Sequence, residues 1–168
     1  MIPDLYKIVD CDDGFLAIMP RPGPEEWLRA EIVELGKMGV TTLVSLLEAS
    51  EEYELTLTAE ADIAVENGIE FVSYPIEDRT VPLDLDSYTN FIFGLADRVL
   101  EGHGVAIHCR AGIGRSGITA AAVMVRIGFD PETVFAQISK ARRCAVPDTY
   151  EQTEWFIQHY KNFLTDTE

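Results

Sequence analysis

A cysteine and an arginine stand close together in a glycine-rich stretch that joins an apolar segment to an alanine-rich one. Residues 105–117 read V-A-I-H-C-R-A-G-I-G-R-S-G, and Ile118 continues into the alanine-rich segment. This order predicts a strand, a tight loop and a helix. Such a loop turns several backbone N–H groups into one concavity, and the helix start adds the positive end of its dipole. The sequence therefore predicts a phosphate cradle.

Cys109 is the candidate nucleophile at the base of this cradle. We expect backbone dipoles and Arg115 to favour its thiolate, because such surroundings lower the pKa of a cysteine from ~8.5 into the range ~3.5–7.5. The planar guanidinium of Arg115 can hold two oxygens of one tetrahedral anion. A small buried cysteine at a strand end is the plainer interpretation. It leaves Arg115 and the glycines Gly112 and Gly114 unexplained.

At these residues the chain resembles the cysteine-dependent protein tyrosine phosphatase superfamily, and its small dual-specificity members in particular. The superfamily signature is H-C-x-x-G-x-x-R-S/T, and every fixed position is met. The resemblance implies phosphomonoester hydrolysis through a cysteinyl-phosphate, with no cofactor and no metal. It also implies that Ser116 helps the sulfur to leave and that His108 orients the loop. The phosphate-binding residues that it implies are Arg110, Ala111, Gly112, Ile113, Gly114 and Arg115.

A general acid is expected from a different loop. Residues 75–82 read P-I-E-D-R-T-V-P and lie between a predicted strand and a predicted helix. A carboxylic acid held near the reacting bond contributes ~10²–10⁴-fold by protonating the leaving oxygen. Asp78 is our candidate, because this stretch resembles the P-x-x-D general-acid loop of small dual-specificity phosphatases. A solvated turn aspartate is the plainer interpretation, and Glu77 and Asp84 are the alternative acids.

Four further polar residues have open roles. Arg110 either adds positive potential toward the substrate or is a solvated side chain, and Ser116 can also be a helix cap. Gln152 lies in P-D-T-Y-E-Q, which resembles a C-terminal stretch of the family, and it either approaches the site or packs on the last helix. Glu48 follows a predicted strand and is a candidate to brace Arg115.

The glycines of the loop also carry a competing interpretation. Gly112, Gly114 and Gly117 spell G-x-G-x-x-G, the pattern of dinucleotide-binding sites between a strand and a helix. Such a site also has a second strand that ends in an acidic residue ~20 positions further on. Residues 128–131 (G-F-D-P) instead start another helix. Because this interpretation also gives the cysteine and the arginine no role, we favour the phosphatase.

The elements around the loop predict how these side chains meet. Strands are expected at residues 5–9, 15–19, 40–47, 69–74 and 105–107, the first two as a hairpin. Helices are expected at residues 25–38, 58–66, 83–100, 117–127 and 130–143 and from about residue 147, with an acidic loop at 48–54. We place Trp27 on the buried side of the first helix, and Arg142 and Arg143 as complements to a helix C-terminus.

The succession of helix, glycine and strand predicts the fold class. It implies crossover connections and therefore an α/β fold with a twisted, mostly parallel sheet of about five strands flanked by helices. Ligands on such sheets bind beyond the carboxyl ends of the strands, where His108 and Cys109 fall. The length of 168 residues suits one domain spanning residues 1–168.

The net charge and the distribution of apolar residues limit the classes of partner that we expect. The chain has 29 acidic and 13 basic residues and a formal net charge of −16, which argues against nucleic acid and anionic membrane as partners. No apolar run approaches the ~20 residues of a membrane span, and the N-terminus lacks a basic signal-peptide start. We therefore expect a cytoplasmic protein. Cys11, Cys109 and Cys144 form neither a disulfide framework nor a zinc-spaced pair.

We therefore expect a protein tyrosine or dual-specificity phosphatase whose substrate is a phosphoprotein or a small phosphate ester. A phosphoinositide or inositol phosphate phosphatase is the alternative, although Arg110, Ala111 and Ile113 stand where that class has paired lysines. A phosphoprotein-binding module without turnover is an alternative of another kind. Such relatives usually lose the cysteine, whereas this chain has Cys109 together with Arg115 and Asp78.

Overall fold

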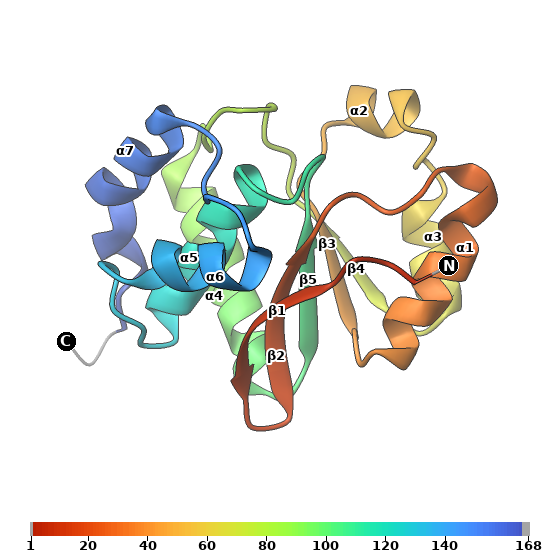
Figure 1. Ribbon diagram of the computed structural model, residues 1–168, viewed down its shortest axis with the longest axis horizontal. Helices are drawn as coiled ribbons and strands as arrows, with labels where there is room; N and C mark the ends of the chain where they lie inside the picture. The colour runs from red at the N-terminus through yellow and green to blue at the C-terminus, as the bar shows by residue number, and fades with distance from the viewer. Residues whose placement is uncertain (1, 166–168) are drawn as a thin grey trace.

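A computed structural model describes residues 2–165, and one sheet lies at its centre (Figure 1). The strands are β1 (Tyr6–Cys11), β2 (Gly14–Met19), β3 (Thr42–Ser45), β4 (Glu70–Ser73) and β5 (Gly104–His108). They form a five-stranded sheet in the order β1-β2-β5-β3-β4. β1 pairs antiparallel with β2, and all the other pairs are parallel. The predicted hairpin and the mostly parallel sheet are therefore confirmed, with β5 in the middle.

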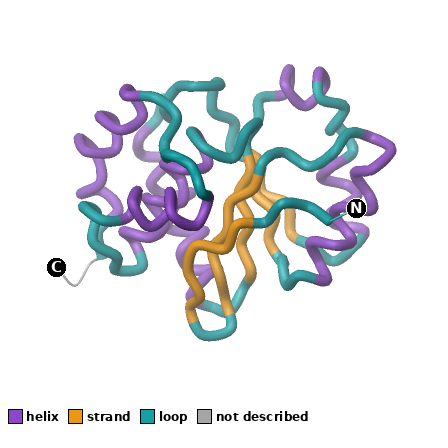
Figure 2. Tube along the Cα trace, in the orientation of Figure 1, coloured by secondary structure: helices purple, strands orange, loops and turns teal. Residues whose placement is uncertain are grey.

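Helices cover both faces of this sheet. They are α1 (Glu25–Lys37), α2 (Ala49–Glu54), α3 (Glu60–Glu66), α4 (Leu85–Leu100), α5 (Arg115–Arg126), α6 (Val134–Arg142) and α7 (Tyr150–His159), followed by a short 3₁₀ helix, η1 (Tyr160–Phe163). α1 and α3 lie on one side of the sheet, and α4 and α5 lie on the other, with α6 beside α5 and against β1 and with α7 farther out (Figures 1 and 2). Among residues 2–165, no helix combines the length and the apolar content that crossing a bilayer requires.

Two apolar cores separated by the sheet follow from the alternation of side chains along each strand. Leu16 and Ile18 of β2 pack into the core under α4 and α5, whereas Phe15, Ala17 and Met19 pack into the core under α1 and α3. Both faces of a parallel sheet are buried by its crossover helices, so its strands read as continuous apolar runs rather than alternating ones. This explains why every residue of β2 is buried.

The parallel pairing brings three loops to one edge of the sheet. β3, β4 and β5 run in the same direction, so their carboxyl ends lie together. The chain continues from β3 into α2, from β4 into the loop at residues 75–82, and from β5 into the glycine-rich loop. The expected site at the carboxyl ends of the strands therefore draws on segments that are far apart in sequence.

The predicted acidic loop at residues 48–54 is wrong, because six of these residues form α2. This helix has no apolar stripe, and periodicity therefore gives no signal for it. The backbone N–H of Glu48 donates to Oε2 of Glu51 over 3.0 Å, which holds the first turn. Trp27 was also misplaced: it is half exposed, and its neighbour Leu28 is the residue that packs in the core.

The last two helices begin later than predicted. α6 starts at Val134, because Asp130 closes a turn instead: its carbonyl accepts from the N–H of Thr133 over 3.0 Å. In α7, the capping pair is Thr149 with Gln152, whose N–H donates to the Thr149 hydroxyl over 3.1 Å. The carboxylate of Asp148, the residue before this cap, instead pairs with Arg79 over 2.7 Å.

Candidate active site

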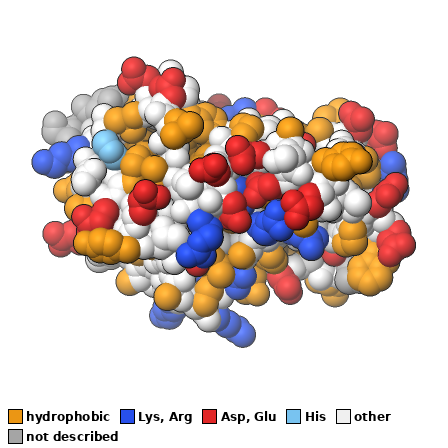
Figure 3. Space-filling view, turned by 90° about the horizontal axis from the view of Figure 1, so that it is seen from above, with side chains coloured by type: hydrophobic (Ala, Val, Ile, Leu, Met, Phe, Trp, Pro, Cys, Tyr) orange, Lys and Arg blue, Asp and Glu red, His pale blue; other side chains and the backbone are white. Residues whose placement is uncertain are grey.

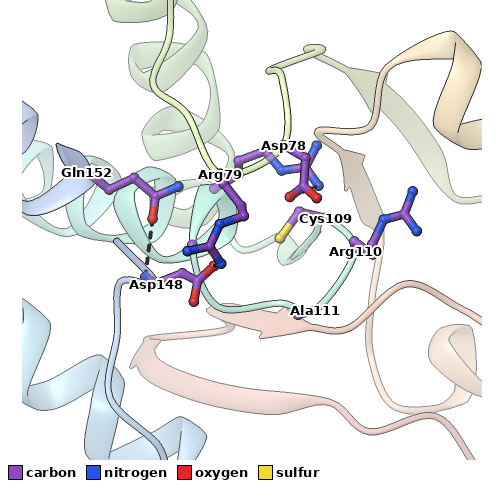
Figure 4. A pocket seen from close by; sticks show the side chains of 9 residues that line it. Asp78, Arg79, Cys109, Arg110, Ala111, Asp148 and Gln152 are labelled. Carbon is purple, nitrogen blue, oxygen red and sulfur yellow. Dashed lines mark hydrogen bonds and ion pairs between the residues drawn. The ribbon is translucent and has the colours of Figure 1, made fainter. Parts of the chain in front are cut away.

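A pocket of about 180 Å³ opens at the edge of the sheet where β5 ends (Figure 4). The loop after β4, the loop after β5 and the start of α7 all contribute to its wall. This volume suits a small polar group rather than a large apolar ligand. The residues that line the pocket are Asp78, Arg79, Cys109, Arg110, Ala111, Gly114, Arg115, Asp148 and Gln152.

Cys109 lies at the bottom of the pocket. Its side chain has a relative exposure of 3%, and its sulfur points into the cavity in Figure 4. The loop after it needs glycine at two points for different reasons. Gly112 has a φ of 73°, and a Cβ there would collide with the backbone of Met19; a Cβ on Gly114 would lie 2.8 Å from the amide of Gln152. Both glycines therefore let the loop close tightly around the sulfur.

The N-terminus of α5 faces the same cavity. The helix begins at Arg115, and the residue before it, Gly114, has no side chain to cap the first backbone N–H groups. Unsatisfied N–H groups and the positive end of the helix dipole favour an anion at this position. The predicted strand, loop and helix thus give the concavity that a tetrahedral oxyanion requires.

Arg115 is held by acceptors from α2 and from the loop after β4. Its Nη1 donates to Oε2 of Glu51 and to the carbonyl of Ile76, both over 2.8 Å, and its Nη2 donates to Oδ1 of Asp78 over 3.0 Å. The guanidinium has only 1% relative exposure. Burial lowers the pKa of Arg115, but the hydrogen bond that it donates to Glu51 and the charges of its acidic neighbours outweigh this effect, so the pKa is raised.

Glu48, our candidate to brace Arg115, was the wrong residue. The chain turns into α2 at Glu48, and the residue one turn later, Glu51, reaches the guanidinium. Burial raises the pKa of Glu51, but the hydrogen bond from Arg115 and the further contacts outweigh it and lower the pKa. Glu51 therefore meets the arginine as a carboxylate.

Asp78 lines the pocket, and the two alternative acids do not. Its side chain is 48% exposed and is linked to Arg115. Glu77 lines a neighbouring pocket on the other side of the loop. Asp84 accepts from the N–H of Ser87 over 3.2 Å and caps α4. Geometry therefore favours Asp78 as the acid within reach of a bound group.

His108 is fully buried behind the loop and pairs with a carboxylate that we did not anticipate. Its Nε2 lies 2.6 Å from Oε2 of Glu60 in α3, and its Nδ1 lies 3.2 Å from the carbonyl of Cys109. Burial alone lowers the pKa of His108, but the charge and the hydrogen bond of Glu60 outweigh it and raise the pKa. Glu60 is far away in sequence and sits in a short helix, so no local pattern pointed to it.

For Ser116 and Arg110, the structure argues against one of the two predicted roles. Ser116 is buried in the first turn of α5 and is not its cap, and its Oγ has no hydrogen-bond partner within residues 2–165. Arg110 turns its guanidinium away from Cys109 toward α2 (Figure 4). There it lies 3.9 Å from Glu51 and 3.7 Å from Glu54.

Gln152 combines both of its predicted positions, because it lines the pocket and is fully buried at the start of α7. Arg142 lies in the last turn of α6, as expected for a complement to a helix C-terminus, and it also makes contacts that we did not anticipate. Its guanidinium donates to the carbonyls of Gly112 and Ala111 over 3.2 and 3.0 Å and braces the glycine-rich loop from outside. It also lies 4.3 Å above the ring of Tyr6.

The charges around the site are largely matched. On the face seen from above in Figure 3, acidic side chains gather around arginine and lysine side chains. Two of the arginines that line the pocket, Arg79 and Arg115, form short ion pairs with Asp148 and Glu51. The protein's own carboxylates therefore already neutralise part of the positive charge that lines the pocket.

Residues 11–156 match the family model described as "Swiss Army Knife protein, DSP-PTPase phosphatase domain". Protein tyrosine phosphatase type IVA 2 of Mus musculus is 32% identical over 114 residues, which is 67% of this chain and 63% of that protein. The chain thus aligns with less than two thirds of the length of this curated relative.

Solved phosphatase structures share the fold over nearly the whole chain. Kinase associated phosphatase, solved with its catalytic-site cysteine substituted by serine, superposes with a TM-score of 0.85 at 19% identity and covers 97% of both chains. Tk-PTP in its active form has a TM-score of 0.76 at 26% identity and covers 95% of this chain and 97% of that chain.

The buried pair of His108 and Glu60 gives a prediction that needs no substrate. Glu60→Gln removes the carboxylate that raises the pKa of His108, so an NMR titration of the histidine ring should show a lower pKa. A raised pKa of His108 stabilises the folded protein fully at pH values below the unfolded-state pKa of 6.5, and this contribution is lost as the pH rises through the folded-state pKa. The difference in the free energy of unfolding between wild type and Glu60→Gln should therefore shrink with increasing pH.

Glu66→Gln is the matched control, since Glu66 lies on the same helix but pairs with Arg29 at the surface. It should leave the titration of His108 unchanged. A pKa of His108 that stays the same in Glu60→Gln would contradict the assignment of this pair.

Proposed function

Since the chain belongs to the family of DSP-PTPase phosphatase domains, we propose that it hydrolyses phosphomonoesters through a cysteinyl-phosphate formed on Cys109. The observation that carries this proposal is that the sulfur, the N-terminus of α5 and the guanidinium of Arg115 border one small pocket. A nucleophile and a set of anion-binding groups around the same cavity are what in-line attack on phosphorus requires.

The first step transfers the phosphoryl group to sulfur. The phosphate group binds with its equatorial oxygens on the loop N–H groups and on Arg115, and the thiolate of Cys109 attacks phosphorus from the bottom of the pocket. The bond between phosphorus and the leaving oxygen breaks as the sulfur–phosphorus bond forms. Because the donors are already fixed by Glu51 and by the turn of the loop, they stabilise the developing charge without reorganising.

Asp78 supplies the proton for the leaving oxygen in this mechanism. In the absence of substrate its Oδ1 accepts from Arg115. A bound phosphate gives that guanidinium new acceptors, which releases the carboxyl group toward the leaving oxygen. In the second step Asp78 takes the proton from the attacking water, and the buried hydroxyl of Ser116 stabilises the departing sulfur. Helix α5 positions the side chain of Ser116. Glu60 positions the ring of His108, which contacts the carbonyl of Cys109.

We propose a phosphoprotein substrate, with phosphotyrosine, phosphoserine or phosphothreonine as the reacting group. The relative from Mus musculus is a protein tyrosine phosphatase by name. The strongly acidic chain, with a net charge of −16, repels the surface of an anionic membrane. Arg110 points toward α2 and pairs with carboxylates there, rather than presenting a free cation to a second phosphate.

Replacement of Cys109 by serine tests the nucleophile. Cys109→Ser should abolish the release of phenol from phenyl phosphate and of phosphate from a phosphotyrosine peptide, while vanadate still binds to the folded variant, because the loop and Arg115 remain. Cys144→Ser is the matched control and should keep its activity, since Cys144 does not line the pocket.

The proposal fails if Cys109→Ser retains full turnover, or if EDTA removes the activity of the wild type. Faster turnover of a phosphoinositide than of phosphopeptides would retain the mechanism and replace the substrate class.

Replacement of Asp78 by asparagine tests the general acid. Asp78→Asn should lower kcat/KM for phenyl phosphate by about 10²-fold or more. Asparagine cannot donate a proton, so the loss should be largest for esters whose leaving oxygen has to be protonated.

Asp84→Asn provides the control, since asparagine also caps helices well and Asp84 lies outside the pocket. Its kcat/KM for phenyl phosphate should match that of the wild type. If Asp78→Asn keeps the wild-type rate, the acid is a different residue and Glu77 is the next candidate.

A further inference from the structure

The residue after the proposed acid reaches across the mouth of the pocket. Arg79 Nη1 lies 2.7 Å from Oδ2 of Asp148, and the two side chains are 63% and 39% exposed. Asp148 stands in the turn just before α7, so this ion pair joins the loop at residues 75–82 to the opposite wall (Figure 4).

A second contact links the same two segments. Nε2 of Gln152 donates to the carbonyl of Thr80 over 3.1 Å. Oε1 of the same amide accepts from the N–H groups of Asp148 and Thr149 over 3.2 and 3.1 Å. Because Gln152 is fully buried, its orientation is fixed, and it holds the start of α7 and the loop together.

The backbone of Arg79 is in a conformation that arginine seldom adopts. Its φ is 63°, in the left-handed region. Side chains other than glycine, asparagine and aspartate are uncommon there because Cβ crowds the following carbonyl. An arginine at such a position needs a compensating contact, and its ion pair with Asp148 is the contact that the structure shows.

Substrate binding makes these contacts necessary. Without substrate, the loop is also tied to the cradle through Asp78 and Arg115. A bound phosphate takes over that donor, so Asp78 loses its tie at the moment when it has to be positioned. Neither Arg79 with Asp148 nor Gln152 with Thr80 uses a donor of the cradle, so neither contact competes with a bound phosphate for those donors.

We propose that Arg79 and Asp148 are positioning residues that, with Gln152, hold the loop closed over Cys109 so that Asp78 meets the leaving oxygen. This inference rests on the proposed phosphatase function and adds to it. The ion pair acts only on the step that needs a proton. Its loss therefore slows esters with a poor leaving group and spares esters whose leaving group departs without protonation.

The test compares two esters in each variant. Phenyl phosphate needs the acid, whereas dinitrophenyl phosphate releases a stable anion. Arg79→Ala and Asp148→Ala should each lower the ratio of kcat/KM for phenyl phosphate over dinitrophenyl phosphate by roughly fivefold, which is the scale of one exposed ion pair. A partly unfolded sample lowers both rates equally, so the ratio is insensitive to loss of fold.

Two further variants test whether the effect comes from the ion pair between Arg79 and Asp148. The double variant Arg79→Ala with Asp148→Ala should lower the ratio no more than either single change, because both changes remove the same ion pair. Arg29→Ala is the matched control. Arg29 and Glu66 form an exposed ion pair with an N–O distance of 2.8 Å, and neither residue lines the pocket. This control should keep the wild-type ratio.

Two outcomes would overturn the inference while leaving the phosphatase intact. One is an unchanged ratio in Arg79→Ala and Asp148→Ala. The other is a loss in Arg79→Ala that is equal for both esters, with Asp148→Ala as active as wild type or more so; Arg79 would then bind substrate directly. A wild type that hydrolyses neither ester would instead overturn the proposed function, and this inference with it.

Discussion

The burial of one cation, the guanidinium of Arg115, is the constraint on which the site depends. A buried charge costs several kcal/mol unless an opposite charge and hydrogen bonds match it, and removal of one partner of such a pair costs ~3–5 kcal/mol. Glu51 and the carbonyl of Ile76 provide that match. As a result, α2 and the loop after β4 are fixed relative to α5, which carries Arg115. These contacts also orient the guanidinium that is proposed to bind phosphate.

The glycine-rich loop is secured from two other directions as well. His108 is held from behind by Glu60, and Arg142 donates to two loop carbonyls from outside. The donors of the cradle are therefore in place before any substrate arrives, which is the condition under which electrostatic stabilisation of a transition state is most effective. The loop that carries Asp78 is different, because its two ion pairs involve exposed side chains: Asp78 is 48% exposed and Arg79 is 63% exposed.

The sequence predicted well those features that are formed by residues close together in the chain. The strand, loop and helix around Cys109, the loop that carries Asp78 and the parallel sheet follow from local pattern and resemblance, and the structure has them at one edge of the sheet. Partners that are distant in the chain were missed. Glu51 sits in a short helix without an apolar stripe, and Glu60 is the first residue of the short helix α3. An acidic residue at either place looks like any solvated one until the fold brings it against a buried base.

The account stands on transfer of the phosphoryl group to one sulfur, and the most direct test is to trap that species. Rapid acid quench during turnover of dinitrophenyl phosphate, followed by peptide mass spectrometry, should find a single added phosphoryl group on the peptide that contains Cys109. An activated ester makes the first step fast, so the intermediate accumulates before water removes it. Turnover without any phosphorylated peptide, or with the group on a residue other than Cys109, would contradict the account.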